Sequence, residues 1–480
     1  MAFSTSALRG RPFLAGSDSF VLGTMSSLSV IIRYVPFRNI DERVGEAIVS
    51  TVEQDKAGNR QTPTKVKARE VERGAGLKQH VAMSHSVAFW LVALAFLLNM
   101  AFSAIPTPLY ELYQARDHFS VFMITIVYAV YAVGVIASLF LAGHISDWIG
   151  RRRVLVGALL INVASALLFI FFPGLIGLIV ARVVCGVAVG MTTATATAYL
   201  AELHLGGSPR ASTNRPQLTA IAANLGGIGF GPLLGGLLAQ FAPAPLRLPF
   251  IVVGAALIVL ALLISFAPET VVILEERPTW RPQRVAVPSE GRRQFFAATA
   301  AGIASFAVYG VFNSLVPSFL AGTLHETSHF VAGAVAFSAF AAGALAQIML
   351  GRLDTMTTLR RSVPILLSGL ALFTIGMWVP SLFIFIVGGV ITGAGAGLVF
   401  RGALVAAAST APLESRAEVM AGFFLGAYVG LSVPVIGLGI ATQHFVAREA
   451  MLVFVVLVAI AIVWSVRAVI RAAGRSLVGN

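Results

Sequence analysis

The sequence predicts an all-α integral membrane protein with twelve transmembrane helices, arranged as two six-helix repeats. Three observations support this fold class: an apolar composition, twelve long apolar runs joined by short loops, and a recurrence of charged, proline and glycine positions between the two halves. Of the 480 residues, 57% are hydrophobic and 11% are charged, and the mean hydropathy is +0.87. Soluble domains carry about 25% charged residues, so a bilayer is the better solvent for this chain.

The apolar runs are long enough to cross a membrane as helices, which takes about 20 residues each. A β-barrel would instead need strands of about ten residues with alternating polarity. In the first half the runs cover 86–106, 121–142, 154–172, 175–200, 216–240 and 248–267. In the second half they cover 295–319, 330–350, 362–379, 381–408, 418–440 and 449–468.

A change of composition near residue 83 sets the domain boundaries. All the lysines precede it, and residues 35–80 are polar and charged. We expect 1–82 to be a disordered tail or a misassigned start rather than a cleaved targeting peptide. The parts predicted after it are a six-helix half at 83–267, a cytosolic linker at 268–293, a second half at 294–470 and a cytosolic tail at 471–480.

The net charge of +13 does not indicate a nucleic-acid partner, because the arginines lie in short loops between apolar runs. With both termini in the cytosol, the outer loops hold only Arg116, Arg247 and Arg448, and the remaining loop arginines of the body are cytosolic. This asymmetry follows the positive-inside rule. We therefore expect a multi-pass protein of the cell (plasma or inner) membrane, surrounded by lipid, with both termini cytosolic.

The two halves repeat at an offset of 207 residues. The matched pairs are Asp147 and Asp354, Arg153 and Arg360, Pro173 and Pro380, Gly186 and Gly393, and Gly190 and Gly397. Two six-helix halves related by a parallel repeat are typical of transporters that rock around a central site.

The most informative motif joins the second and third apolar runs. It reads Gly143-His-Ile-Ser-Asp147-Trp-Ile-Gly150-Arg151-Arg152-Arg153. This loop resembles the one between helices 2 and 3 of the major facilitator superfamily of secondary transporters. The resemblance covers about 84–470 and implies that superfamily's twelve-helix fold. It also implies that the loop is a gate, which latches the cytosolic side shut in the outward-open state. The alternative is a basic turn that serves topology only.

Each part of the gating loop has an expected contact. Gly143 should let helix 2 approach a neighbouring helix closely. Asp147 can face the positive N-terminus of another helix, such as helix 11. The three arginines can pair with Glu414 or Glu418, near the start of that helix.

A second motif lies in helix 4, where Arg182, Gly186 and Gly190 follow one another at four-residue spacing. The two glycines share a helical face and allow close packing. Arg182 lies well inside the span, where an unpaired charge is costly and therefore a candidate for function. The family resemblance implies a role in proton coupling. The alternative is an arginine bonded to backbone carbonyls for structure alone.

The third motif lies in helix 5 and spans 227–236, with Gly227, Gly231, Pro232, Gly235 and Gly236 at its defining positions. It resembles the pattern of the superfamily's drug:proton antiporters and therefore implies export. Pro232 removes a backbone donor and favours a bend, while the glycines allow close contact. The alternative is generic glycine-rich packing. Residues 267–270 (Ala-Pro-Glu-Thr) match another family signature, which says little about chemistry.

Several polar side chains inside the spans are candidates for coupling or substrate binding, besides Arg182. They are Asn99, Tyr128, Tyr131, Asn224, Tyr309, Asn313 and Tyr428, with Gln347 as a further polar group. Each of them alone is better explained by a hydrogen bond between helices than by a ligand contact, but together they could converge on a cavity. Arg401 either extends to the membrane interface or lines the inner vestibule.

The sequence carries no sign of an enzyme. It has no phosphate-binding Gly-rich loop with Lys-Ser/Thr, its histidines are scattered, which argues against a metal site, and Cys185 is its only cysteine. We expect no cofactor and a monomer.

The expected function is proton-coupled efflux of small amphipathic compounds or metabolites by alternating access. The alternatives are an importer of organic anions or metabolites and a non-transporting membrane sensor of the same fold. One feature departs from the antiporter pattern, because no span contains a deep Asp or Glu. The protonatable candidates are therefore Glu111 and Asp117 on the outside and Glu202 on the inside, and the interior suits a neutral or anionic substrate.

Overall fold

The computed structural model describes residues 83–207, 214–271, 281–283, 287, 291–412 and 415–478. These residues belong to one compact unit, 81–480. The expected tail at 1–82, most of the expected linker and Glu414 lie outside the described residues, so the predictions made for them stay predictions.

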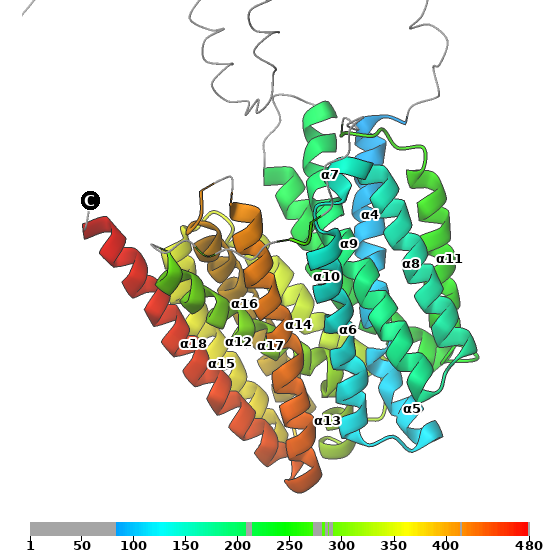
Figure 1. The fold of residues 1–480 in the computed structure, drawn as a ribbon. Helices are drawn as coiled ribbons and strands as arrows, with labels where there is room; N and C mark the ends of the chain where they lie inside the picture. The colour runs from blue at the N-terminus through cyan, green and yellow to red at the C-terminus, as the bar shows by residue number, and fades with distance from the viewer. Residues whose placement is uncertain are drawn as a thin grey trace, which may run out of the picture. The chain divides into compact units, whose positions relative to one another are not determined.

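The described residues are almost entirely helical (Figure 1). The first half contains α4 (His85–Ala104), η2 (Thr107–Leu109), α5 (Tyr110–Asp117), α6 (Val121–Ala142), α7 (Ser146–Ile149), α8 (Arg151–Phe171), α9 (Leu175–Gly207), α10 (Asn214–Phe241) and α11 (Leu248–Ile264). The second half contains α12 (Arg292–Ser314), α13 (Val316–Thr323), α14 (His329–Met349), α15 (Thr355–Trp378), α16 (Leu382–Ala408), α17 (Arg416–His444) and α18 (Ala447–Val478).

Among the described residues, eleven helices are long and apolar enough to cross a membrane. The shorter α11, of 17 residues, supplies the twelfth span, because about 17 residues are the lower limit for crossing the hydrocarbon core. The predicted twelve-helix fold is therefore confirmed. One predicted helix is divided: the run at 295–319 breaks between α12 and α13 at Leu315. Pro317 then lies in the first turn of α13, a position where a missing N–H costs little.

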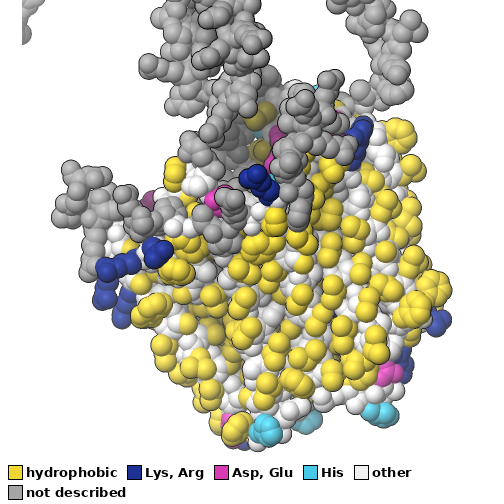
Figure 2. Space-filling view, in the orientation of Figure 1, with side chains coloured by type: hydrophobic (Ala, Val, Ile, Leu, Met, Phe, Trp, Pro, Cys, Tyr) yellow, Lys and Arg dark blue, Asp and Glu magenta, His cyan; other side chains and the backbone are white. Residues whose placement is uncertain are grey.

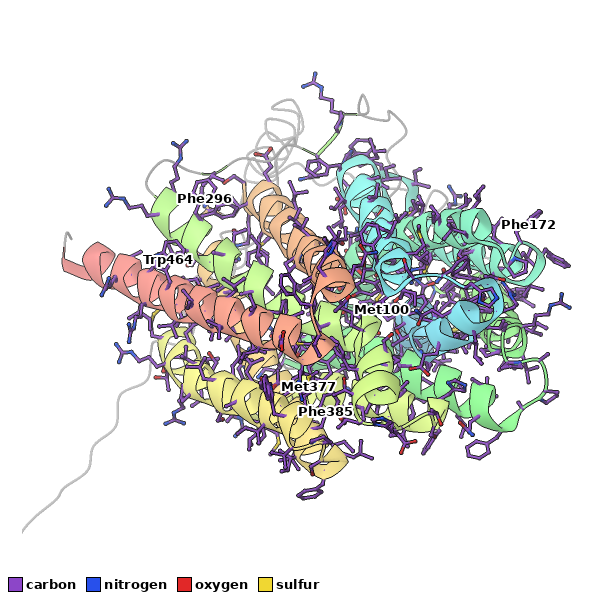
Figure 3. The ribbon with its side chains drawn as sticks, turned by 90° about the horizontal axis from the view of Figure 1, so that it is seen from below. Met100, Phe172, Phe296, Met377, Phe385 and Trp464 are labelled. Atoms are coloured by element: carbon purple, nitrogen blue, oxygen red, sulfur yellow. The ribbon has the colours of Figure 1, made fainter. Side chains whose placement is uncertain are left out.

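The outer surface is apolar, as a lipid-facing surface must be. Hydrophobic side chains cover the middle of the face in Figure 2, and charged and histidine side chains lie toward its two ends. Phe172 lies at the edge of the molecule in Figure 3 and is 61% exposed, whereas Met100 lies between helices and is 1% exposed. Trp464 and Phe296 are 63% and 58% exposed. A continuous exposed apolar surface of this extent is unusual in soluble monomers.

The internal repeat predicted from the sequence is visible in the packing. A Cβ at Gly186 would overlap the carbonyl oxygen of Tyr131 in α6, and a Cβ at Gly393 would overlap that of Ala339 in α14. Gly190 and Gly397 pack on the same two helices. The pair α9 and α6 in the first half therefore corresponds to the pair α16 and α14 in the second.

The helices define two ends of the molecule. One end carries α7 and the C-terminus of α18, and the other carries α5 and α13 (Figure 1). Contacts between the halves close the α5 end. Thr107 donates to the backbone and side-chain oxygens of Asn313 at 2.8 Å each, and the backbone N–H of His329 donates to Gln240 Oε1 at 3.0 Å.

Candidate functional site

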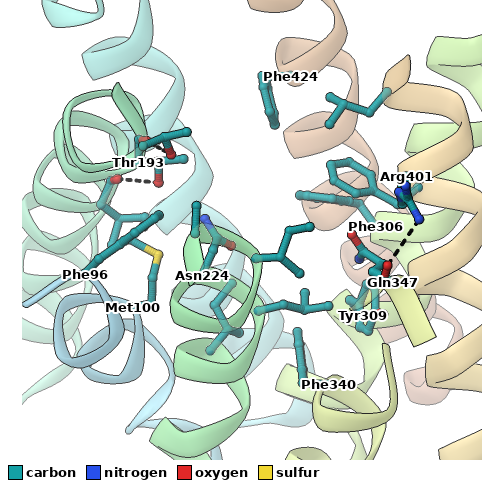
Figure 4. A pocket seen from close by; sticks show the side chains of 18 of the residues that line it. Phe96, Met100, Thr193, Asn224, Phe306, Tyr309, Phe340, Gln347, Arg401 and Phe424 are labelled. Carbon is teal, nitrogen blue, oxygen red and sulfur yellow. Dashed lines mark hydrogen bonds between the residues drawn. The ribbon is translucent and has the colours of Figure 1, made fainter. Parts of the chain in front are cut away.

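A cavity of about 470 Å³ lies between the two halves. It is large enough for a small organic molecule, since ligand pockets typically measure about 300–1,000 Å³. The first half contributes residues of α4, α6, α9 and α10, and the second half contributes residues of α12, α14, α16 and α17. Figure 4 shows side chains from both halves facing one another across this space.

The cavity opens toward the α7 end. Its lining includes Leu205 at the end of α9 and Gln217 at the start of α10, and both are exposed. Its deeper lining includes Tyr128 and Asn313, which are 2% and 6% exposed. Asn313 also belongs to the contacts that close the α5 end. The structure therefore has one accessible end and one sealed end.

The cavity lining contains six of the polar candidates predicted from the sequence. They are Tyr128, Tyr131, Asn224, Tyr309, Asn313 and Tyr428, and Gln347 lines it as well. Tyr309 donates its hydroxyl to the carbonyl of Gly393 at 2.8 Å, which holds its ring against that of Phe340 at 4.7 Å. These residues come from five helices, and the cavity brings them together.

Asn99 is the exception, because it lies outside the cavity lining. Its side chain is fully buried. The amide donates to Thr192 Oγ1 at 2.8 Å and accepts from Asn162 Nδ2 at 2.8 Å. Asn99 thus joins α4 to α8 and α9. This is the structural role that the sequence analysis kept open for each polar residue in a span.

Arg182 lies behind the cavity wall. It is 1% exposed, and its guanidinium donates to the backbone carbonyls of Ser103 and Tyr128. Its Cζ lies 4.6 Å from the ring centroid of Tyr131 and 5.6 Å from that of Tyr128. Carbonyls and aromatic faces thus stabilise the charge. Arg182 supports two tyrosines that face the cavity, and its predicted role in coupling or binding stays a prediction.

The helix 5 motif lies in α10 and packs this helix on both halves. Cβ atoms at Gly227, Gly231 and Gly235 would overlap backbone carbonyl oxygens on successive turns of α4 and at its C-cap, and the closest overlap is at Gly231. On another face of α10, Gly236 meets the backbone of His329 in α14. Pro232 lies inside the helix, and its carbonyl abuts Gly333 of α14. The motif thus forms part of the seam between the halves.

The gating loop makes contacts that differ from those expected. Arg151 pairs with Asp147 and with Glu202 Oε1, the latter at 3.0 Å. Both partners belong to the first half, so the expected pairing with Glu418 of α17 is not what the structure shows. The cavity is open at this end. The family resemblance implies that the gating loop closes this end only in the outward-open conformation, so its pairing there stays a prediction.

Two other contacts of this loop also differ from those expected, in this conformation. Asp147 pairs with Arg151 and is 52% exposed, rather than facing the start of α17. The atoms nearest a Cβ at Gly143 belong to Leu139 of the same segment, because Gly143 caps α6 instead of packing on a neighbouring helix. Arg152 donates to the carbonyl of Ala267 at 3.0 Å, and Arg153 is exposed.

Glu269 is the residue of this region whose role the sequence analysis missed. Its Oε1 and Oε2 accept the backbone N–H groups of Arg151 and Arg152 at 2.8 and 3.2 Å. These are the first N–H groups of α8, which have no partner inside the helix and favour a negative charge. Gly150 makes room with φ of 106°, because a Cβ there would overlap the Glu269 carboxylate. The only signals in the sequence were an acidic residue just after α11 and a glycine just before α8, and these two positions are far apart along the chain.

We expect Glu269→Ala to lower the melting temperature of the purified protein clearly more than Asp147→Asn does. The first variant leaves two N–H groups of α8 without a charged acceptor, a loss of about 1–3 kcal/mol. The second removes an ion pair whose carboxylate is half exposed, and such pairs contribute about 1 kcal/mol or less. Equal shifts in thermal unfolding, followed in detergent, would show that the cap stabilises the protein no more than the half-exposed ion pair does.

The comparisons with known proteins agree with this geometry. A family model described as Major Facilitator Superfamily matches residues 92–354 and 297–476. The solved structure of a bacterial homologue of the human lysosomal transporter Spinster, inward-facing and unoccupied, is similar with a TM-score of 0.59 and 15% identity, over 81% of this chain and 98% of that one. A variant of the nucleoside transporter NupG is similar with a TM-score of 0.60 and 13% identity, over 79% and 99%. No curated protein matches the sequence. Because the family model covers most of the chain, the protein belongs to the major facilitator superfamily.

Proposed function

We propose that the protein exports small amphipathic compounds or metabolites across the cell membrane by alternating access, in exchange for protons. The cavity between the two halves carries this proposal, because it is open at one end and sealed at the other. In an exporter with cytosolic termini, the open α7 end faces the cytosol and receives the substrate there.

Export is favoured over import by the helix 5 motif. Its glycines press α10 against both α4 and α14, so α10 belongs to the seam that must separate when the α5 end opens. The resemblance of the motif to the antiporter pattern is a feature of the sequence, and its place in this seam is consistent with a part that moves during export. A sensor without transport would not need a seam that closes one end of the cavity.

The coupling site that fits best is a pair of titratable groups in the closed seam. Glu111 Oε2 of α5 lies 3.8 Å from His329 Nδ1 of α14, and the two side chains are 17% and 18% exposed. Among the described residues, Glu111 Oε1 and His329 Nδ1 have no hydrogen-bond partner. Burial disfavours an ionised carboxyl, and exposure favours it. Opening the α5 end would expose both groups and so alter their proton occupancy.

The neighbouring charged groups are already engaged elsewhere. Arg116 pairs with Asp117 on α5. Glu326, ahead of α14, accepts the backbone N–H of Ser328 at 3.0 Å. Glu111 is therefore the acid that we expect to exchange a proton between conformations.

We expect Glu111→Gln to abolish proton-driven uptake of substrate into inside-out liposomes while leaving downhill flux. Glutamine keeps the shape of the side chain, but its amide cannot take up and release a proton as a carboxyl group does. Glu326→Gln is the matched control, because it lies at the same end but bonds within its own loop. Wild-type proton-driven flux in the Glu111 variant would remove this residue from coupling without removing transport.

The direction of transport is tested by flux of anionic, neutral and cationic amphipathic compounds under gradients of both signs. An exporter in inside-out liposomes accumulates substrate when the lumen is acidic. Accumulation under the reversed gradient only would show import, and no movement of any compound, with binding retained, would indicate a sensor.

A further inference from the structure

We infer that the cavity binds amphipathic monoanions and that Arg401 binds their acid group. The inference rests on the proposed function, because it names the substrate class of the same cavity. It concerns ligands that carry one carboxylate, sulfate or sulfonate on an aromatic or branched apolar body.

The charge of the cavity lining favours an anion. Of the described residues that line it, none is an aspartate or glutamate, and Arg401 is the single one with a permanent charge. In a medium of low dielectric constant, one unbalanced positive charge attracts an anion and repels a cation much more strongly than it would in water. An amphipathic cation would find no counter-ion on these walls.

The geometry of Arg401 leaves part of its guanidinium for a ligand. Its Nη1 donates to the carbonyl of Gln347 at 3.1 Å, and its Nη2 donates to that of Gly351. These carbonyls, at the end of α14, hold the side chain in place but do not neutralise it. None of the ion pairs formed by the described residues includes Arg401. Guanidinium presents further N–H groups in a planar fork that matches a carboxylate or sulfonate.

The wall beside Arg401 suits an apolar body. The rings of Phe306 and Phe400 lie 4.7 Å apart, Phe306 and Tyr428 lie 5.7 Å apart, and Phe400 and Phe424 lie 6.4 Å apart. All of them line the cavity, and Figure 4 shows Phe306 next to Arg401. A ligand whose acid group meets Arg401 therefore places its apolar part against this aromatic wall.

Arg182 is not an equivalent binding site for an anion. Its guanidinium is covered by Tyr128 and Tyr131, and it does not belong to the cavity lining. An anion could reach it only after both rings had moved.

The test uses two fluorescent probes that share one skeleton. 1-Anilinonaphthalene-8-sulfonate carries a sulfonate, and N-phenyl-1-naphthylamine lacks it. We expect the full-length protein in lipid nanodiscs to bind the sulfonate at least about tenfold more tightly than the neutral probe, after subtraction of binding to empty nanodiscs. Equal or weaker binding of the sulfonate would overturn the inference from the wild-type protein alone.

Variants of Arg401 then test whether this residue binds the sulfonate. Arg401→Gln should bring the affinity for the sulfonate down to that for the neutral probe, and should leave the neutral probe unchanged. Arg401→Lys should keep part of the preference, because it keeps the charge but loses the fork. Arg352→Gln is the control, since it removes an exposed arginine near the same end that does not line the cavity. An unchanged preference in Arg401→Gln, or an equal loss for both probes, would show that Arg401 only holds the end of α14.

The failure of this inference can be told from the failure of the proposed function. If flux occurs but neutral compounds are preferred, the proposed transport is supported and anion binding at Arg401 is refuted. If the sulfonate binds through Arg401 but nothing is transported, anion binding is supported and the proposed transport is refuted.

Discussion

Gly231→Leu is expected to prevent most of the protein from assembling as a monodisperse species. A Cβ at this position would overlap the carbonyl oxygen of Ala101 and lie 3.1 Å from the Cβ of Ala104. Both atoms belong to α4, whose backbone cannot rotate out of the way as a long side chain could. Forcing extra atoms into a packed interface costs about 1–3 kcal/mol and sometimes more. Size-exclusion profiles and melting temperatures of the purified protein measure the loss.

Gly226→Leu is the matched control. It lies in the same helix, and no atom outside the adjacent turns of that helix lies within 4 Å of a Cβ built there. Leucine is also a better helix former than glycine by about 1 kcal/mol, so this variant should be as stable as the parent or slightly more so. If both variants behaved alike, close approach of α10 and α4 would not explain the motif.

Arg182→Ala is expected to reduce transport at least about tenfold while the protein still folds. The substitution leaves the carbonyls of Ser103 and Tyr128 without a donor, which costs about 1–3 kcal/mol. It also removes a charge from the membrane interior, which relieves a cost of similar size. The larger effect is on the cavity, because the rings of Tyr131 and Tyr128 lose the guanidinium on which they lie.

Arg182→Lys separates charge from geometry. Lysine keeps the charge but cannot donate to two carbonyls in one plane, so we expect it to lose transport as well. The readouts are flux in liposomes and the melting temperature of the same preparations. An Arg182→Ala protein that is monodisperse and transports at the parent rate would confine this residue to a structural role.

The sequence predicted those features that depend on residues close together along one helix. Helical periodicity puts Gly186 and Gly190 on one face, and the structure packs that face on α6. The same reasoning brought most of the polar candidates in the spans to one cavity, because polar groups avoid lipid and turn toward the space between helices.

Contacts between distant segments could not be predicted in this way. Glu269 caps a helix that begins 118 residues earlier, and Glu202 partners Arg151 across 51 residues. Both depend on how complete helices pack. The same holds for Arg182 and Asn99, which lie behind the cavity wall rather than on it, a difference of side-chain direction that spacing alone does not decide.

The most direct test of alternating access is a reversible cross-link across the closed seam. A Cβ at Gly439 of α17 would lie 3.1 Å from the Cβ of Thr125 in α6, close to the separation of about 3.5–4.5 Å in disulfides. The double variant Thr125→Cys and Gly439→Cys should therefore form a disulfide on oxidation. Cys185, the only native cysteine, is buried in α9, and the parent protein that contains it alone is the control.

The measurement is proton-driven flux of amphipathic compounds in liposomes, before oxidation, after oxidation and after reduction. Alternating access predicts that oxidation stops the flux, because the α5 end can no longer open, and that reduction restores it. Binding of the sulfonate probe should persist in the oxidised protein, since the α7 end stays open. Undiminished flux through the fully cross-linked protein would contradict a mechanism in which the two halves part at the α5 end.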